Sequence, residues 1–137
     1  MKNIIVTDSC ALILLAKCGM LELLAEVIPI IMPEGVYKEI VNKELIEKYA
    51  DAAIISELVL KKRIKVVPVK HKSLRVPISM DKGELEALIL ASQTAEPILA
   101  TDDRKAIKAC RYLKIPFIIT PKIAIELDRM DKIDFER

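Results

Sequence analysis

Carboxylates recur in this sequence at points where short apolar runs end or helical patterns begin. Asp8 follows one apolar run and Asp102–Asp103 follow another, while Glu39, Glu84 and Glu86 lie in the first turns of helical patterns. Carboxylate oxygens are hard ligands that select Mg²⁺ or Mn²⁺ over zinc. If they gather at one place, they predict a divalent-metal site of the kind that hydrolyses phosphodiesters by activating water.

Some of these acids also have a purely structural interpretation. Asp81 with Glu84 three residues later forms a capping-box pattern, and Asp102 after Thr101 can cap a helix. Glu86 is harder to explain in this way, because an apolar run follows it and an unpaired carboxylate beside buried residues is costly. The acids with the weaker structural interpretation are Asp8, Glu39, Glu86 and Asp103.

The apolar runs and helical repeats indicate which elements position these acids. Short runs, mostly of unbroken Ile and Val, are typical of parallel strands buried on both faces. These runs are Ile4–Thr7, Ile28–Met32, Lys65–Val69, Ile98–Thr101 and Phe117–Thr120. Helical patterns lie between them, at Cys10–Ala25, Glu34–Val41, Glu44–Lys62, Asp81–Gln93, Arg104–Leu113 and Pro121–Met130. The alternation predicts an α/β fold, a three-layer α/β/α sandwich with a mainly parallel sheet whose strand ends carry the acids along one edge.

The composition indicates one globular unit. The 137 residues are 53% hydrophobic, and 22 basic side chains against 20 acidic ones leave a formal net charge of +2. We expect a single domain over residues 1–137, since no linker or repeat interrupts the chain. Charged residues break the first apolar run, so we expect neither a signal peptide nor a membrane span.

Several classes of chemistry are excluded by what the chain lacks. Its three glycines lie too far apart for a phosphate-binding loop or a dinucleotide fingerprint. His71 is the only histidine, which argues against a Ser-His-Asp triad or a zinc site with several histidines. Cys10, Cys18 and Cys110 show no CxxC spacing, and we expect them to be core residues of a cytoplasmic protein.

Four motifs in order carry a resemblance to a known family. They are IIVTDS ending at Ser9, the Pro33-x-x-Val36-x-x-Glu39-Ile40 pattern, the GELEALILA string from Gly83, and Thr101-Asp102-Asp103. With these motifs the sequence resembles a PIN-domain nuclease. It is similar to the small prokaryotic PIN proteins that include the toxins of VapBC-type toxin–antitoxin pairs.

The resemblance implies a metal-dependent endoribonuclease, a hydrolase acting on RNA phosphodiesters. Asp8, Glu39, Glu86 and Asp103 occupy the positions of the family's site acids, with Asp8, Glu86 and Asp103 as ligands of Mg²⁺ or Mn²⁺. Glu39 is our candidate for taking the proton of the attacking water. The positions with an accessory or alternative role are Ser9, Glu84, Asp102 and Thr101, and Glu84 is open as the ligand in place of Glu86.

The expected partners are RNA, an antitoxin protein and a second copy of the chain. Basic clusters that can meet phosphates are Lys61–Arg63, Lys70–Arg75, and the set Arg104, Lys105, Lys108 and Arg111, although each can equally be a solvated surface. The apolar strip of Glu44–Lys62 can serve a protein partner or belong to the core. The alternative functions are a catalytically silent PIN-fold scaffold for RNA or protein and, less favoured, phosphoryl transfer through an aspartyl phosphate.

Overall fold

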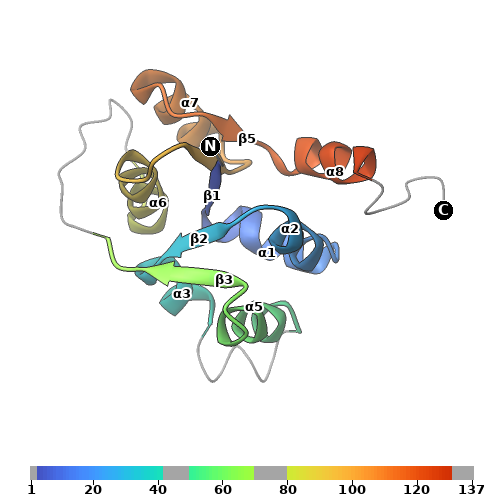
Figure 1. Ribbon diagram of the computed structural model, residues 1–137. Helices are drawn as coiled ribbons and strands as arrows, with labels where there is room; N and C mark the ends of the chain where they lie inside the picture. Colours follow the sequence, from blue (N-terminus) through green and yellow to red (C-terminus); the bar gives the residue numbers. More distant parts are fainter. Residues whose placement is uncertain (1–2, 42–49, 70–79, 131–137) are drawn as a thin grey trace.

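The computed structural model describes residues 3–41, 50–69 and 80–130, in which strands and helices alternate along the chain (Figure 1). The strands are β1 (Ile4–Thr7), β2 (Ile30–Pro33), β3 (Ile64–Val67), β4 (Pro97–Ala100) and β5 (Phe117–Ile118). They form one sheet in the order β3-β2-β1-β4-β5, and every pair is parallel. The parallel α/β sheet predicted from the unbroken Ile and Val runs is therefore confirmed.

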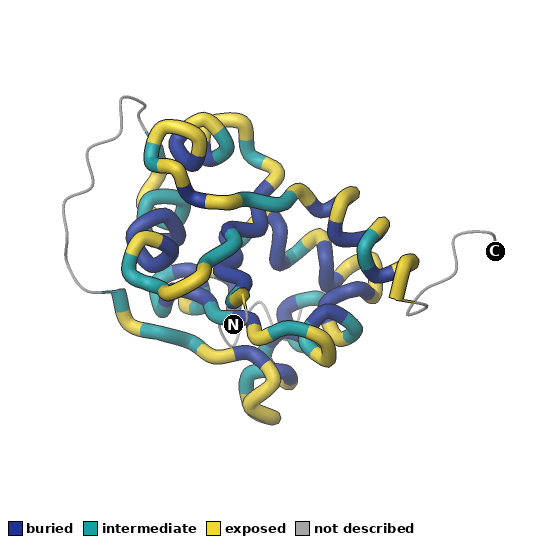
Figure 2. The backbone as a smooth tube through the Cα atoms, turned by 45° about the horizontal axis from the view of Figure 1, so that its top comes forward, coloured by how far each residue is buried: buried dark blue, intermediate teal, exposed yellow. Residues whose placement is uncertain are grey.

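Helices cover both faces of this sheet. They are α1 (Ser9–Lys17), α2 (Leu21–Val27), α3 (Glu34–Ile40), α5 (Ala50–Leu60), α6 (Lys82–Ser92), α7 (Arg104–Leu113) and α8 (Thr120–Arg129). Successive residues of β1 point to opposite faces. Ile5 packs into a core with α1, α2, α3, α5 and α8, whereas Val6 packs with α6 and α7. The buried segments run through the middle of the molecule (Figure 2), as expected of a three-layer α/β/α sandwich.

The register of the central strands sets the position of the acids. Thr7 pairs with Ala100 at the carboxyl ends of β1 and β4, so the next residues, Asp8 and Thr101, come side by side. Since all strands are parallel, helices α1, α3 and α7 begin at this same edge. The predicted gathering of strand ends is thus present in the fold.

The first helical pattern of the sequence forms two helices in the structure, and not the single helix that was expected. Residues 10–25 were predicted to form a single helix, but α1 ends at Lys17 and α2 begins at Leu21. Gly19 lies between them with a φ of +71°, in the left-handed region that glycine adopts at little cost. The chain therefore turns here, which lets both helices bury their leucines against the same face of the sheet.

The expectation that all three cysteines belong to the core is wrong for two of them. Cys10 and Cys18 are exposed, because they lie at the two ends of α1 on its solvent side, and only Cys110 is buried. All three are free thiols. An apolar neighbourhood in the sequence did not reveal which side of the helix each residue faces.

The strip of Glu44–Lys62 is mainly core where the structure describes it. In α5, Ala52, Ile55 and Leu58 are buried, and Ile55 and Leu58 belong to the core shared with α1. Leu60, near the end of this strip, is 79% exposed and does not belong to the core. Residues 42–49 of this strip, and the basic segment Lys70–Arg75 with His71, lie outside the described residues.

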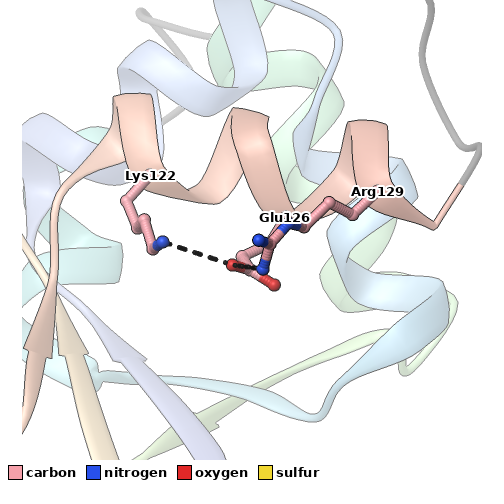
Figure 3. Close-up of polar contacts among 3 residues, drawn as sticks. All are labelled: Lys122, Glu126 and Arg129. Atoms are coloured by element: carbon pink, nitrogen blue, oxygen red, sulfur yellow. Dashed lines mark hydrogen bonds and ion pairs between the residues drawn. The ribbon is translucent and has the colours of Figure 1, made fainter.

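The last helix carries ion pairs on its solvent side. Glu126 accepts from Lys122 at 3.4 Å and from Arg129 at 3.4 Å (Figure 3). Such exposed pairs contribute little to stability, since water screens them. Among the helices of the described residues, none combines the length and apolar character needed to cross a membrane.

Candidate functional site: carboxylates at the carboxyl edge of the sheet

Asp8 is held at the junction between β1 and α1. Its Oδ1 accepts a hydrogen bond from the backbone N–H of Ala11 at 2.9 Å, so it is the N-cap of α1. Its Oδ2 accepts a hydrogen bond from the hydroxyl of Thr101. The residue is only 3% exposed, so these two bonds determine where its carboxylate points.

Thr101 also connects Asp8 to Asp103. The backbone N–H of Asp103 donates to the Thr101 hydroxyl oxygen at 3.2 Å, and that hydroxyl donates onward to Asp8. Asp103 in turn caps α7, because its Oδ2 accepts from the backbone N–H of Ala106 at 3.0 Å. Thr101 therefore links Asp8, which follows β1, to Asp103, which lies shortly after β4.

The acids at this edge influence one another electrostatically. Burial raises the pKa of Asp8, and the charges of Asp102 and Asp103 raise it further against the lowering effect of its hydrogen bonds. Burial also raises the pKa of Glu84, as do the charges of Asp103, Asp81 and Asp8. Like charges brought together in this way favour a bound cation.

The sequence left open whether Glu84 or Glu86 is the third site acid, and in the structure the two side chains have different surroundings. Glu84 lies near enough to Asp8 and Asp103 for their charges to affect it. The Glu86 carboxylate instead lies against Gly35 of α3, where a Cβ atom would overlap it. Two residues apart on one helix, the side chains point about 200° apart around the axis, so only one of them can face the Asp8 side directly.

Glu86 shares a groove of about 300 Å³ between α3 and α6 with Glu39. The groove is lined by Gly35, Lys38, Glu39, Lys82, Gly83 and Glu86. Glu39 also lines an adjoining pocket of about 340 Å³ together with Ser9, so it lies between α1 and α6. The four predicted site acids therefore do not meet at one point: Asp8 and Asp103 are linked through Thr101, and Glu39 and Glu86 line the groove.

Sequence reasoning missed the glycines and lysines of this groove. A Cβ atom on Gly83 would lie 3.1 Å from Oε2 of Glu39, and the missing side chain of Gly35 makes room for Glu86. Lys38 and Lys82 bring positive charge to the same groove. The available signal was a glycine within each of two helical patterns, since glycine there is otherwise unfavourable.

Asp102 has a structural partner. Its two carboxylate oxygens accept hydrogen bonds from the backbone N–H and the hydroxyl of Thr120, both at 2.8 Å. These bonds hold the start of α8 against the end of β4. The prediction that Asp102 caps the helix after it is wrong, because Asp103 is the residue that caps α7.

The chemistry of the donors suits a hard divalent cation. Asp8, Glu84 and Asp103 offer only carboxylate oxygens, and no ion pair found in the described part of the chain engages Asp8. A buried carboxylate without a cation is costly, so a cation would be favoured beside Asp8. Within residues 3–41, 50–69 and 80–130, however, no three such side chains converge closely enough to coordinate one ion.

Solved structures support the assignment of the fold. The chain is similar to a PilT N-terminus domain protein from the hyperthermophilic archaeon Sulfolobus solfataricus P2, with a TM-score of 0.62, 16% identity, and 90% of this chain and 92% of that one covered. It is also similar to the PIN domain endonuclease Utp24, with a TM-score of 0.56, 15% identity, and 85% and 84% covered. A PIN-like three-layer sandwich is thereby shown.

A family model described as a PIN domain matches residues 4–136. The chain therefore belongs to the PIN-domain family, as the four sequence motifs indicated. No curated protein matches it. The family and the endonuclease among the similar structures support a nuclease-type fold.

Proposed function

We propose that this protein is a metal-dependent endoribonuclease that hydrolyses RNA phosphodiesters. The observation that carries the proposal is the Asp8–Thr101–Asp103 connection at the carboxyl edge of the sheet, in a chain of the PIN-domain family. Ligands of open α/β sheets bind at this edge. RNA as the substrate follows from the resemblance to PIN nucleases.

In this proposal Asp8, Asp103 and Glu84 hold Mg²⁺ or Mn²⁺, and Glu86 is the alternative third ligand. A bound ion supplies positive charge against the charge that develops on the phosphate, and it makes water a better nucleophile. Asp8 is suited to a ligand role because each of its oxygens accepts only one hydrogen bond, which leaves a lone pair on each. Thr101 positions that carboxylate, and its hydrogen bonds tie the position to the end of β4.

Glu39 is our proposed acceptor for the proton of the attacking water. It lines the groove beside Glu86 and the pocket beside Ser9, so it faces solvent that reaches the carboxyl edge. A carboxylate that is not required as a ligand is free to take a proton. Ser9, one residue after Asp8, is the supporting hydroxyl in the pocket.

The biological setting that we propose is a cytoplasmic toxin of a toxin–antitoxin pair. The free thiols fit a reducing compartment. An antitoxin protein and a second copy of the chain are the proposed protein partners. These points rest on the resemblance to the small prokaryotic PIN proteins.

The test is cleavage of a mixed-sequence single-stranded RNA with Mn²⁺, Mg²⁺ or EDTA. Asp8 and Asp103 are both N-caps, and asparagine caps helices as well as aspartate does, so Asp8→Asn and Asp103→Asn remove charge while keeping the caps. Asp128→Asn is the control, because Asp128 is an exposed acid on α8 and its substitution removes one negative charge without changing the acids at the carboxyl edge.

We expect cleavage that requires the metal, is lost in Asp8→Asn and Asp103→Asn, and is kept in Asp128→Asn. Equal cleavage by all variants would identify a contaminating nuclease. Metal-independent binding of RNA without any cleavage would favour the silent scaffold.

A further inference from the structure

Helix α7 presents a set of basic side chains with no acid among them. Its sequence, RKAIKACRYL, contains Arg104, Lys105, Lys108 and Arg111, all exposed, and no Asp or Glu. The opposite side of the helix is buried through Ala106, Ala109 and Cys110. The basic side chains therefore form one solvent-facing surface, which we call the α7 surface.

The α7 surface begins at the candidate site. Asp103 is the N-cap of α7 and Arg104 is its first residue. Positions i, i+4 and i+7 share one side of a helix, so Arg104, Lys108 and Arg111 form a row. At 1.5 Å per residue this row extends on the order of 10 Å away from the carboxyl edge.

The cations of this surface form no ion pair with an acid in the part of the chain that the structure describes. In residues 3–41, 50–69 and 80–130 the ion pairs engage Lys38, Lys61, Lys122 and Arg129, and none of them engages α7. An unpaired row of cations attracts a polyanion, because binding releases the counterions that both surfaces carry.

The far end of the row offers flat groups as well as charge. The guanidinium of Arg111 lies over the ring of Phe117, 5.7 Å from its centroid, and Tyr112 beside it is 62% exposed. The ring of Phe117 lies within cation–π range of the guanidinium, and Arg111 is otherwise exposed to solvent. Unstacked bases of single-stranded RNA stack on such Arg planes and aromatic rings, whereas bases within a duplex cannot.

We propose that α7 is the path of single-stranded RNA as it leaves the carboxylate site. Phosphates lie against Arg104, Lys105 and Lys108, and a base stacks at Arg111 and Tyr112. This inference rests on the proposed function, because it names how that function's substrate is held. It also predicts a preference for unpaired RNA.

The first test measures binding without cleavage. A fluorescein-labelled single-stranded RNA is titrated in EDTA by anisotropy at several salt concentrations. The α7 variant carries Arg104→Gln, Lys108→Gln and Arg111→Gln. The charge-matched control carries Lys62→Gln, Arg63→Gln and Lys65→Gln, which lie at the start of β3 and so at the opposite edge of the sheet.

We expect the α7 variant to bind on the order of tenfold more weakly, with the slope of log K against log salt reduced by about 2, while the control keeps the wild-type slope. Equal binding by the two variants, or no binding by wild type at the lowest salt, would overturn the inference. Competition by duplex RNA as strong as that by single strands would overturn it too.

The second test isolates the stacking step. Arg111→Lys keeps the charge and removes the plane, so it should weaken binding of ordinary RNA and leave binding of an abasic oligonucleotide as in wild type. An equal loss on both oligonucleotides would remove the stacking step. The two proposals can fail separately. Metal-dependent cleavage together with unchanged RNA binding by the α7 variants would reject only the RNA path along α7. RNA binding that depends on α7, without any cleavage, would reject only the nuclease function.

Discussion

The hydroxyl of Thr101 donates to the buried carboxylate of Asp8 across 93 residues of sequence. The same hydroxyl oxygen accepts from the backbone N–H of Asp103. A single side chain thus sets the orientation of one aspartate and the backbone position of another. The carboxyl ends of the two central strands are held together by this hydroxyl in addition to the pairing of the sheet.

Removing that hydroxyl should affect stability and activity together. Thr101→Val keeps the shape of the buried side chain but leaves the Asp8 oxygen without a donor, which should cost about 1–3 kcal/mol of unfolding free energy. Denaturant unfolding measures this cost and RNA cleavage measures the positioning. Thr101→Ser keeps the hydroxyl, so it should recover most of the activity; a serine variant as inactive as valine would contradict the positioning role.

Mn²⁺ should stabilise the wild-type protein in the absence of RNA. An ion that binds only the folded state increases the free energy of unfolding, by about 2.7 kcal/mol at a hundred times its Kd. The melting temperature therefore rises with the ion's concentration. Asp8→Asn should remove this increase, since the neutral amide is a poor ligand for a hard cation. Thermal unfolding with Mn²⁺ or EDTA checks this expectation, with Asp128→Asn as the control that retains the increase. An equal response of wild type and Asp8→Asn would place the ion elsewhere.

We expect Glu84, and not Glu86, to be the third acid that binds the metal. Because Glu84 lies in the field of Asp8 and Asp103, Glu84→Gln should lower Mn²⁺ affinity by at least about tenfold. Glu86→Gln should leave the affinity close to wild type. A larger loss in Glu86→Gln would reverse our assignment.

Gly35→Ala provides an independent check on Glu86. The new Cβ would overlap the Glu86 carboxylate and displace this flexible side chain, while alanine is the better helix former by about 1 kcal/mol. We expect a fold at least nearly as stable as wild type and unchanged Mn²⁺ affinity. Loss of metal affinity in this stable variant would show that Glu86 is a ligand.

Cys110 should make stability decrease at alkaline pH. Burial, with a smaller contribution from the charge of Asp8, raises the pKa of its thiol from 9.0 to about 11. The unfolded chain releases this proton first, so between pH 9 and 11 the thiolate favours unfolding and the folded state loses stability as pH rises. Denaturant unfolding from pH 8 to 11 should show a shallower decrease in Cys110→Ala. Parallel curves for the two proteins would contradict the raised pKa.

Much of the fold was predictable because buried parallel strands leave a strong pattern. Runs rich in Ile and Val predicted each strand of the described residues, with ends displaced by up to two residues, since local sequence seldom determines where pairing stops. The break at Gly19 was missed because the leucines continue past it at helical spacing. The helix ends there because Gly19 adopts a left-handed backbone conformation, which permits the turn.

The candidate site was predictable as an edge but not as a set of contacts. The ends of the predicted strands indicated where Asp8 and Asp103 lie, and the parallel pairing of β1 with β4 brings these two residues together. Glu84 and Glu86 could not be distinguished, because the choice depends on the rotation of α6 about its axis, and α6 is apolar over most of its surface after Glu86. The Thr120 partner of Asp102 was hidden for the same kind of reason, since it comes from α8.

The placement of β1 between β2 and β4 has a consequence for synthesis of the chain. Chains grow from the amino terminus, and β1 can pair with β2 early. Its other edge stays open until β4 has been made, and Thr101 and Asp103 come only after β4. A chain interrupted before this point carries Asp8 without either partner. The Asp8–Thr101–Asp103 connection is therefore assembled only when most of the domain has been translated.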